Sequence, residues 1–238
     1  MRMKKLEKST LCYLTGCMTI GVLFSFGVSQ FLWLVSADNR IDSYANVVLN
    51  HAEMVAGNLT TALDELNTTP HESCGPSDLD ALKRVTYEYR FVKDAGRIEN
   101  KAINCSAMWG VIPDFRLTGE SRVTQNNVQL WGGVSSYFPS AVKIDISAKG
   151  NSFVVTSPTA FAPFESPPVE LSSSVVSRDG KTIMRTFGEF HQGNMLTSAF
   201  AKLCSEKYDI CVVSNIDANI FTTNKPGLLL FIALIGCS

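Results

Sequence analysis

Cysteine thiols are the side chains of this 238-residue chain whose type and spacing could do chemistry, because two thiols can be oxidised to a disulfide. The chain has seven cysteines. Three stand in uncharged runs near the two ends, where a thiol usually behaves as a small apolar side chain: Cys12, Cys17 and Cys237. The other four stand between those runs and are the candidate disulfide and redox residues: Cys74, Cys105, Cys204 and Cys211.

Other reactive groups form no recognisable catalytic or ligand-binding pattern. The sequence has no Glu-Ala-Leu signature, P-loop, GxGxxG, HExxH or CxxC. His51, His71 and His191 are too scattered in sequence to suggest a metal site, and Cys204 and Cys211 are too widely spaced for a zinc knuckle. We therefore predict no catalytic residue, cofactor or metal in this chain. A net charge of −1 gives no electrostatic footprint for nucleic acid, which we exclude as a partner.

An uncharged, apolar run extends from Ser9 to Ala37, after a basic start that holds Arg2, Lys4, Lys5 and Lys8. Its roughly 29 residues exceed the about 20 that a helix needs to cross a bilayer. We predict a membrane helix at 11–36, with 1–10 in the cytoplasm and the following chain outside, because basic flanks stay inside. The alternative is a cleaved signal peptide ending at Val35-Ser36-Ala37, although an apolar region of such a peptide usually has only about 7 to 15 residues.

A second uncharged run, Pro226 to Ser238, closes the sequence. Its roughly 13 residues would make about 20 Å of helix, which is short of the roughly 30 Å hydrocarbon core. We predict that 226–238 begins a second membrane helix in a fragment or an interrupted gene; a short buried segment is the alternative. An outer domain would then occupy 37–225, with the lipid bilayer as a partner.

A long amphipathic helix is predicted from Asp38 to about Leu66, continuing from the membrane helix. Its apolar residues recur at steps of three and four: Ile41, Tyr44, Val47, Val48, Met54, Val55, Leu59, Leu63 and Leu66. Gly57 and Asn58 weaken its middle, where the sequence would allow a kink or break. The helix is either a mechanical lever or a cover over one face of the core.

The stretch from Cys74 to Gly110 organises the outer domain. A helix of about three turns is predicted from Ser77 to Tyr87, with Ser77 as its N-cap and with apolar residues at helical spacing: Leu79, Leu82 and Val85. After it, the apolar residues Phe91, Val92, Ile98 and Ile103 surround two turn signals, 94–96 and 99–101. This pattern predicts short strands, with Cys105 on one of them.

Beyond Gly110 the chain favours strands and turns. Strands are predicted at 115–117, 128–131, 144–146, 152–156, 173–177, 182–187 and 210–213, with 111–114 as a connection and 119–127 as a loop. Residues 178–181, Arg-Asp-Gly-Lys, predict a tight hairpin, because glycine accepts positive φ without steric cost. Prolines 158, 163, 167 and 168 predict an irregular segment. A helix is predicted from Phe190 to Cys204, with Asn194 as a candidate cap. The fold class is therefore α+β, with a long helix packed on an antiparallel sheet.

The four outer cysteines are an even number in a compartment that permits disulfides. They allow three pairings, and the sequence alone leaves these open. We favour Cys74 with Cys105 and Cys204 with Cys211, because each pair brackets one local unit. A bond from Cys74 to Cys105 is either a redox-sensitive element or a permanent staple with no regulatory role.

Three segments together resemble the CSS-motif sensor domain of bacterial EAL-type cyclic-di-GMP phosphodiesterases. They are Cys74 with Pro76, the run from Tyr89 to Ile98, and Asn104-Cys-Ser-Ala-Met-Trp-Gly110. Cys105 and Ser106 match the Cys-Ser-Ser motif, whereas Ala107 departs from it; the motif residues taken from the resemblance are Cys105, Ser106, Ala107, Trp109 and Gly110. The departure puts any need for a second hydroxyl in doubt.

The resemblance implies a PAS-like or Cache-like periplasmic domain between two helices of the bacterial inner membrane. It also implies that the disulfide of Cys74 and Cys105 restrains a cytoplasmic phosphodiesterase, whose catalytic half this sequence lacks and to which a divalent metal such as Mg²⁺ or Mn²⁺ would belong. Expected partners are the periplasmic disulfide-forming system and a second copy of the chain. Two alternatives stay open: a Cache-like module that binds a small ligand in its core, and a signal-anchored surface protein without a signalling role.

Overall fold

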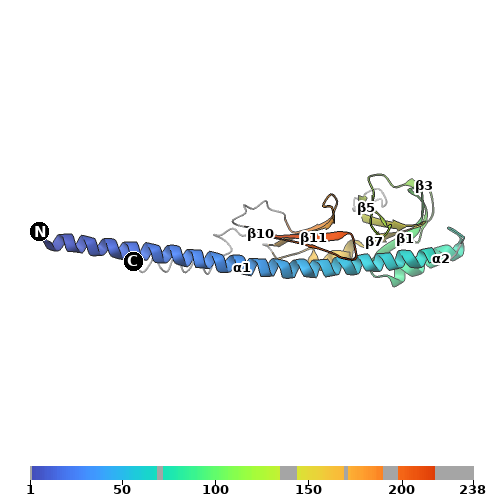
Figure 1. Cartoon of the computed structure of the whole chain (residues 1–238). Coiled ribbons are helices and arrows are strands. Elements are labelled where there is room, and N and C mark those ends of the chain that lie inside the picture. Colours follow the sequence, from blue (N-terminus) through green and yellow to red (C-terminus); the bar gives the residue numbers. More distant parts are fainter. Residues whose placement is uncertain (1, 69–71, 135–143, 169–170, 190–197, 218–238) are drawn as a thin grey trace.

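A computed structural model describes the chain except for residues 1, 69–71, 135–143, 169–170, 190–197 and 218–238. Its longest element is a continuous helix, α1 (Arg2–Thr68), of 67 residues. At a rise of 1.5 Å per residue, α1 is about 100 Å long. The rest of the described chain lies along the second half of this helix (Figure 1).

The predicted amphipathic helix is confirmed within α1. Ile41, Val48, Leu59 and Leu63 are buried, and they follow one another at helical spacing. Val47 and Met54, which the apolar pattern also included, are instead more than half exposed. The helix does not break at Gly57.

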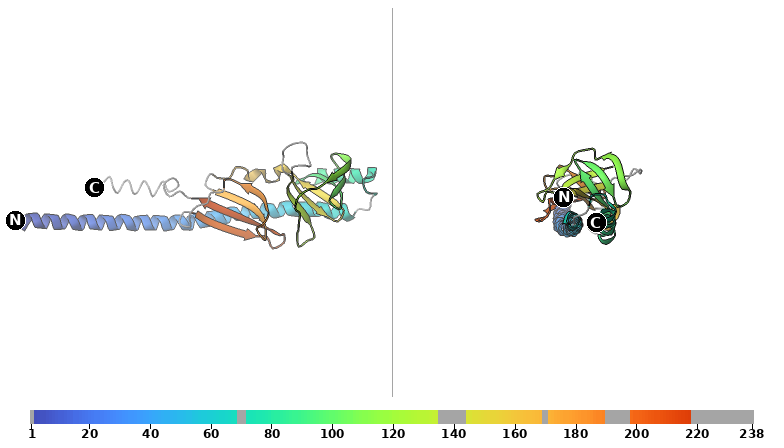
Figure 2. Two further views of the ribbon diagram at one scale, coloured as in Figure 1. Left: turned by 90° about the horizontal axis from the view of Figure 1, so that it is seen from above. Right: turned by 90° about the vertical axis from the view of Figure 1, so that its right-hand side faces the viewer.

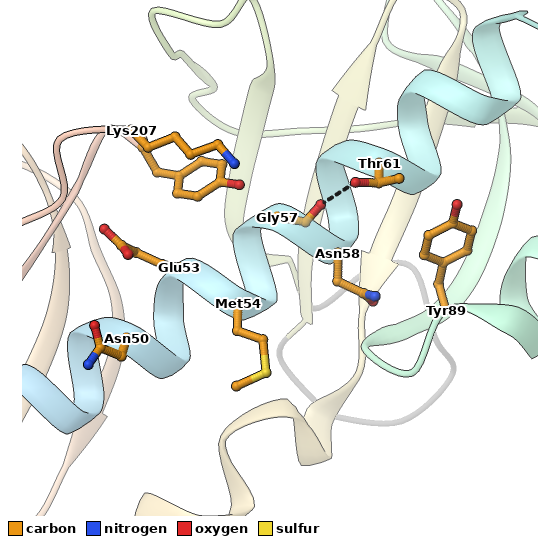
Figure 3. A pocket seen from close by; sticks show the side chains of 9 residues that line it. Asn50, Glu53, Met54, Gly57, Asn58, Thr61, Tyr89 and Lys207 are labelled. Atoms are coloured by element: carbon orange, nitrogen blue, oxygen red, sulfur yellow. Dashed lines mark hydrogen bonds between the residues drawn. The ribbon is translucent and has the colours of Figure 1, made fainter.

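Gly57 allows a close approach to α1 from another element. A Cβ atom at Gly57 would lie 2.8 Å from the hydroxyl oxygen of Tyr208. Tyr208 belongs to the turn that also carries Lys207, which Figure 3 shows beside α1 near Gly57. A shallow hollow on this side of α1 lies between that turn and Tyr89 (Figure 3). The glycine that weakens helix propensity therefore leaves room for the Tyr208 hydroxyl against α1.

None of the helices in the described part of the chain is long and apolar enough to cross a bilayer. Residues 11–36, predicted as a membrane helix, lie within α1. The second predicted membrane segment, 226–238, lies outside the described residues.

The second helix, α2 (Pro76–Glu88), confirms the predicted helix but not its cap. Gly75 is the N-cap residue, with extended backbone, and Pro76 occupies the first helical position. Proline suits this position because its missing N–H would have no helical partner there. Ser77 consequently lies inside the first turn and does not cap it. Leu82 and Val85 are buried, as the spacing predicted.

Seven strands form the first sheet, in the spatial order β3-β2-β1-β7-β6-β5-β4, with every neighbouring pair antiparallel. The strands are β1 (Val92–Glu99), β2 (Ala102–Ser106), β3 (Gly110–Arg116), β4 (Arg122–Val123), β5 (Gln129–Val134), β6 (Ile144–Lys149) and β7 (Ser152–Thr156). The predicted turn at 99–101 is confirmed, and Asn100 and Lys101 have positive φ. The predicted turn at 94–96 is wrong, because these residues lie inside β1. The predicted connection at 111–114 is likewise part of a strand, β3.

A 3₁₀ helix, η1 (Pro158–Phe164), leads from the first sheet toward the second. The second sheet has the order β10-β11-β8-β9 and is also antiparallel. Its strands are β8 (Leu171–Ser177), β9 (Ile183–Phe187), β10 (Ser198–Cys204) and β11 (Ile210–Asp217). The hairpin predicted at 178–181 is confirmed, since β8 pairs with β9 around it and Gly180 has a φ of +73°.

The helix predicted from Phe190 to Cys204 is wrong where the structure describes it, because residues 198–204 form β10. Ala199 and Ala201 are buried while Phe200 between them is 63% exposed. This period of two is the pattern of a strand, and it was hidden among residues with good helix propensity. The candidate cap Asn194 lies outside the described residues.

Two sheets, rather than the single predicted sheet, follow one another along α1 (Figure 2). One buried core lies between α1 and both sheets. It includes Leu63 of α1, Val154 of β7 in the first sheet and Val212 of β11 in the second sheet. A second core, with Trp131 and Phe153, belongs to the seven-stranded sheet. The helix α1 contacts β10 and β11 as well as β6 and β7, so that a single rigid element touches both sheets.

Candidate functional site

The Cys74–Cys105 disulfide forms the centre of the candidate site. Cys74 lies in the turn before α2, with a φ of +63°, and Cys105 lies on β2 and is fully buried. Their Cα atoms are 5.8 Å apart, and 31 positions separate them in sequence. Because Cys74 is half-buried, the bond joins a partly accessible turn to a strand inside the domain.

A buried ion pair lies beside this disulfide. The Nε of Arg97 donates to the two carboxylate oxygens of Asp78, at 3.1 and 3.0 Å, and its Nη2 contacts the same carboxylate. The Asp78 side chain is 0% exposed and that of Arg97 is 5% exposed. Asp78 also accepts a hydrogen bond of 2.9 Å from the backbone N–H of Cys74. A carboxylate in the first turn of α2 is also favoured by the positive end of the helix dipole.

The disulfide and the ion pair close a ring of contacts. Arg97 on β1 is the register partner of Cys105 on β2. Both strand residues therefore hold the start of α2, one through an ionic contact and the other through a covalent bond. Breaking the covalent bond would leave a charged tether in place.

Arg97 extends this ring to the end of α1. Its Nη1 donates to the carbonyl oxygen of Leu66 at 3.0 Å and to the hydroxyl of Ser152 at 2.6 Å. That hydroxyl in turn donates to Asn67, whose amide donates to the carbonyl oxygen of Lys149. The last turn of α1, the start of α2 and strands β1 and β7 thus meet at one buried guanidinium.

The serine of the motif shapes the turn between β2 and β3. The hydroxyl of Ser106 accepts from the backbone N–H of Trp109 at 3.1 Å. Asp94, fully buried on β1, accepts from the N–H of Met108 at 3.0 Å. Ala107 contributes its backbone N–H to the carbonyl oxygen of Ala95, so this turn needs no hydroxyl at position 107.

Gly96 is required by the spacing of β1 and β2. A Cβ atom there would lie 2.2 Å from the carbonyl oxygen of Cys105 and 2.4 Å from the ring of Phe153. Real Cβ atoms do not come this close to backbone oxygens, so only glycine fits without moving the strands.

The second disulfide, Cys204–Cys211, joins β10 to β11, where the two residues face each other in register. Their Cα atoms are 4.0 Å apart. Seven sequence positions separate them, against 31 for the first bond, so the chain loop that it closes is short. This bond reinforces a hairpin that is already paired and connects no further element.

The structure therefore brings together three of the predicted site residues, Cys74, Cys105 and Ser106, and it forms both favoured disulfides. Trp109 is about half exposed, and Gly110 has a φ of +68°, which suits glycine at the start of β3. The sequence interpretation missed Asp78, Arg97 and Asp94. Asp78 stands three positions after an N-cap, where an acidic side chain is often found reaching back, and this was the available signal.

The first of the three histidines, His51, packs against aromatic side chains. The Nε2 of His51 lies 2.6 Å from the carbonyl oxygen of Ala160, and its ring packs against Phe161 and Phe164. His51 is thus a partly buried residue that packs against the core, whereas His71 and His191 lie outside the described residues. Among the residues that the structure describes, no group of histidine, cysteine and acidic side chains could hold a metal ion.

The arrangement defines a class of protein: an α+β domain built along one long helix and closed by two disulfides. Disulfides of this kind fit an extracytoplasmic location, because reducing compartments rarely retain them. The sequence profile of the CSS motif domain associated with EAL matches residues 37–228. The chain belongs to this CSS-motif family.

One relative matches part of the chain. A protein of Escherichia coli strain K12 named as a probable cyclic di-GMP phosphodiesterase, PdeB, is 25% identical over 124 residues. The match covers 50% of this chain and 24% of the relative, so it spans about a quarter of the relative's length. No solved structure matches, and the expected likeness to PAS or Cache domains therefore stays a prediction.

Proposed function

We propose that this chain is the periplasmic, redox-responsive input region of a cyclic-di-GMP phosphodiesterase anchored in the bacterial inner membrane. Membership of the family associated with EAL supports a cyclic-di-GMP phosphodiesterase as the output, and the name of the E. coli relative, a probable cyclic di-GMP phosphodiesterase, supports the same chemistry. The two disulfides support the outer compartment. The membrane helices at 11–36 and 226–238 belong to the proposal.

One observation carries the redox part of the proposal: the Cys74–Cys105 bond closes a ring that includes the end of α1. The bond fixes the start of α2 on β2, and Arg97 joins the same turn to the carbonyl oxygen of Leu66. Reduction of the disulfide would therefore affect α1 through two contacts, the Asp78–Arg97 ion pair and the hydrogen bond from Arg97 to the carbonyl oxygen of Leu66. The other disulfide joins β10 and β11, which are already paired in register, so its reduction would leave the contacts of these strands with α1 in place.

The proposed switch is a two-electron reaction. A dithiol reductant attacks the disulfide, both sulfur atoms of the protein take up a proton, and the reductant leaves as a disulfide. The reverse reaction transfers two electrons to a disulfide oxidant of the same compartment. Cys74 is the sulfur open to attack, because Cys105 is fully buried while Cys74 is half-buried.

The response follows from a difference in stability between two states, since a signal without such a difference would shift nothing. In the oxidised state the ring holds α1 in one register against the seven-stranded sheet. After reduction only the Asp78–Arg97 pair and its hydrogen bonds hold the turn, so the end of α1 is released in part. The 67-residue continuous helix would carry this change toward the membrane.

Thiol trapping and enzyme output together test the proposal. Cells with and without their periplasmic disulfide catalyst are treated with a thiol reagent, and we expect Cys74 to be labelled only in cells that lack the catalyst. In a complete protein that carries an EAL domain, Cys105→Ala should raise phosphodiesterase output as reduction does. The matched control is Cys204→Ala with Cys211→Ala, which removes the hairpin disulfide and should leave the output unchanged. Equal output from wild type and Cys105→Ala would refute the redox proposal.

A further inference from the structure

A cavity of about 510 Å³ lies between the two sheets above α1. Its floor is the side of α1 that carries Ala52, Val55, Ala56, Leu59 and Leu63. Two of these residues are alanines, whose short side chains leave space above the helix. The longer side chains make this surface of the cavity apolar. A volume of this size is in the range of small-molecule sites, which are usually concave and mostly apolar.

Two ion pairs on the lining of this cavity connect the sheets. Arg122 on β4 of the seven-stranded sheet pairs with Asp209, which directly precedes β11 of the four-stranded sheet. Arg185 on β9 pairs in the opposite direction with Asp145 on β6, at 3.1 Å. All four side chains line the cavity. The walls are therefore joined by charges that could rearrange around a ligand.

Hydrogen-bond donors without acceptors gather on this lining. In the described part of the chain, the buried atoms without a hydrogen-bond partner include Nη1 of Arg122 and Nη2 of Arg185. The Nη2 of Arg185 is close to Asp145 but is not aligned for a hydrogen bond. Both arginines line the cavity. Native proteins bury few unsatisfied donors, so these two guanidinium groups are available to an acceptor that enters the cavity.

The charges on the lining limit what the acceptor can be. Four cations and four acids line the cavity: Arg122, Lys181, Arg185 and Lys207, with Glu120, Asp145, Asp179 and Asp209. A guanidinium fork fits a carboxylate with two parallel hydrogen bonds. Because these charges cancel, a monoanion would leave an excess of one negative charge, whereas a doubly charged phosphate would leave two and would face the same four acidic side chains. Burial raises the pKa of the Asp145 carboxyl, which shows how weakly this wall is solvated.

We propose that the cavity binds a small monocarboxylate with an apolar body, the carboxylate on Arg122 and the body on the floor formed by α1. Such a ligand would contact both sheets and the helix at once. It would therefore add a second, chemically independent input to the redox input proposed above. The disulfide of Cys74 and Cys105 does not line this cavity, so the two inputs can be tested separately.

Thermal unfolding of the purified 238-residue chain, with its disulfides intact, tests this site. The probes are hexanoate and phenylacetate, and their amides, hexanamide and phenylacetamide, are the uncharged controls. Binding to the folded state alone raises stability in proportion to the logarithm of one plus ligand concentration over Kd. We expect both acids to raise the melting temperature with a saturable dependence on concentration, and the amides to do so at least tenfold more weakly.

Variants connect that shift to Arg122. Arg122→Gln should weaken acid binding at least tenfold, and Asp209 keeps a cation in this variant because Arg178 also pairs with it at 3.5 Å. Arg116→Gln is the matched control, since Arg116 is exposed on β3 and lies outside the cavity. If Arg122→Gln does not fold, Arg122→Lys keeps the charge and removes the forked donor. The proposal is overturned if neither acid binds, if acids and amides bind alike, or if the Arg122 and Arg116 variants bind equally.

Discussion

Arg97 lies directly opposite Cys105 across the β1–β2 pair, and each of these residues is joined to the turn that begins α2. The covalent and the ionic contact thus act on the same turn from neighbouring positions of one sheet. If the disulfide were the one contact that held this turn, its reduction would release the turn completely. In the proposed switch, the Asp78–Arg97 ion pair would still hold this turn after reduction, with less restraint than the two contacts together.

The two disulfides should differ in their contribution to stability. The chain-entropy estimate gives about 3 to 4 kcal/mol for a loop of 31 positions and about 2 to 2.5 kcal/mol for one of 7 positions. Replacing both cysteines of a pair by alanine, and following unfolding in urea, measures each value. Equal losses for the Cys74/Cys105 and Cys204/Cys211 double variants would contradict this expectation.

Removing the charge of Asp78 should be severe. Asp78→Asn leaves the Arg97 guanidinium buried without its counter-ion, which costs about 3 to 5 kcal/mol when a buried pair loses one partner. Chemical unfolding of the oxidised chain measures this loss. Asp64→Asn is the control, because the Asp64–Lys149 pair is 51% and 33% exposed and should contribute at most about 1 kcal/mol. A smaller loss of stability in Asp78→Asn than in Asp64→Asn would show that Asp78 does not hold the turn before α2 in place.

The disulfide and the ion pair should be coupled. Because both hold the same turn, losing one makes the domain depend more on the other, and contacts of this kind commonly couple by about 0.5 to 3 kcal/mol. We expect Asp78→Asn to cost more in the reduced chain than in the oxidised chain. A double-mutant cycle with Cys74→Ala/Cys105→Ala measures the difference. Simple additivity would show that the two contacts do not share a structural unit.

Gly96→Ala should force β1 away from β2. Its Cβ would overlap the carbonyl oxygen of Cys105 and the ring of Phe153, so we expect a loss of about 1 to 3 kcal/mol or more. Gly132→Ala is the matched control, since the nearest atom to its Cβ would be 3.8 Å away. Unfolding of the two variants in urea gives the comparison. Similar stability of the two variants would contradict a steric requirement for glycine at position 96.

Stability should fall at high pH through Tyr89. Burial, and then the hydrogen bond that its hydroxyl donates to Glu65 at 2.7 Å, raise the pKa of Tyr89 from 10.0 to about 12. A group whose pKa is raised on folding stabilises the fold fully below its unfolded pKa. This contribution is therefore complete below pH 10.0 and is lost as the pH rises toward about 12.

Tyrosinate absorbance measures the effect directly. We expect Tyr89→Phe to remove an ionisation step near pH 12, and Tyr87→Phe, at a side chain that is 94% exposed, to leave that step in place. Persistence of the step in Tyr89→Phe would assign it to another of the six tyrosines.

Local signals in the sequence were sufficient for the elements that form from neighbouring residues. The apolar spacing of Leu82 and Val85 predicted α2, and the glycine at 180 predicted a hairpin, because both features depend on a few consecutive dihedral angles. Where the tertiary structure competes with propensity, the prediction failed. Residues 198–204 became a strand because burying Ala199 and Ala201 beside β11 outweighs their preference for helix.

The sequence by itself determined the α+β class, the long amphipathic helix and the candidate cysteines of the motif, because periodicity and residue type are local properties. Only the tertiary structure decided that Asp78 and Arg97 meet beside the disulfide, and that α1 ends on the same guanidinium. It also decided that two sheets, rather than one, enclose a cavity above α1. These relationships join residues far apart in the chain, and a side chain carries no local mark of a partner that only folding brings near.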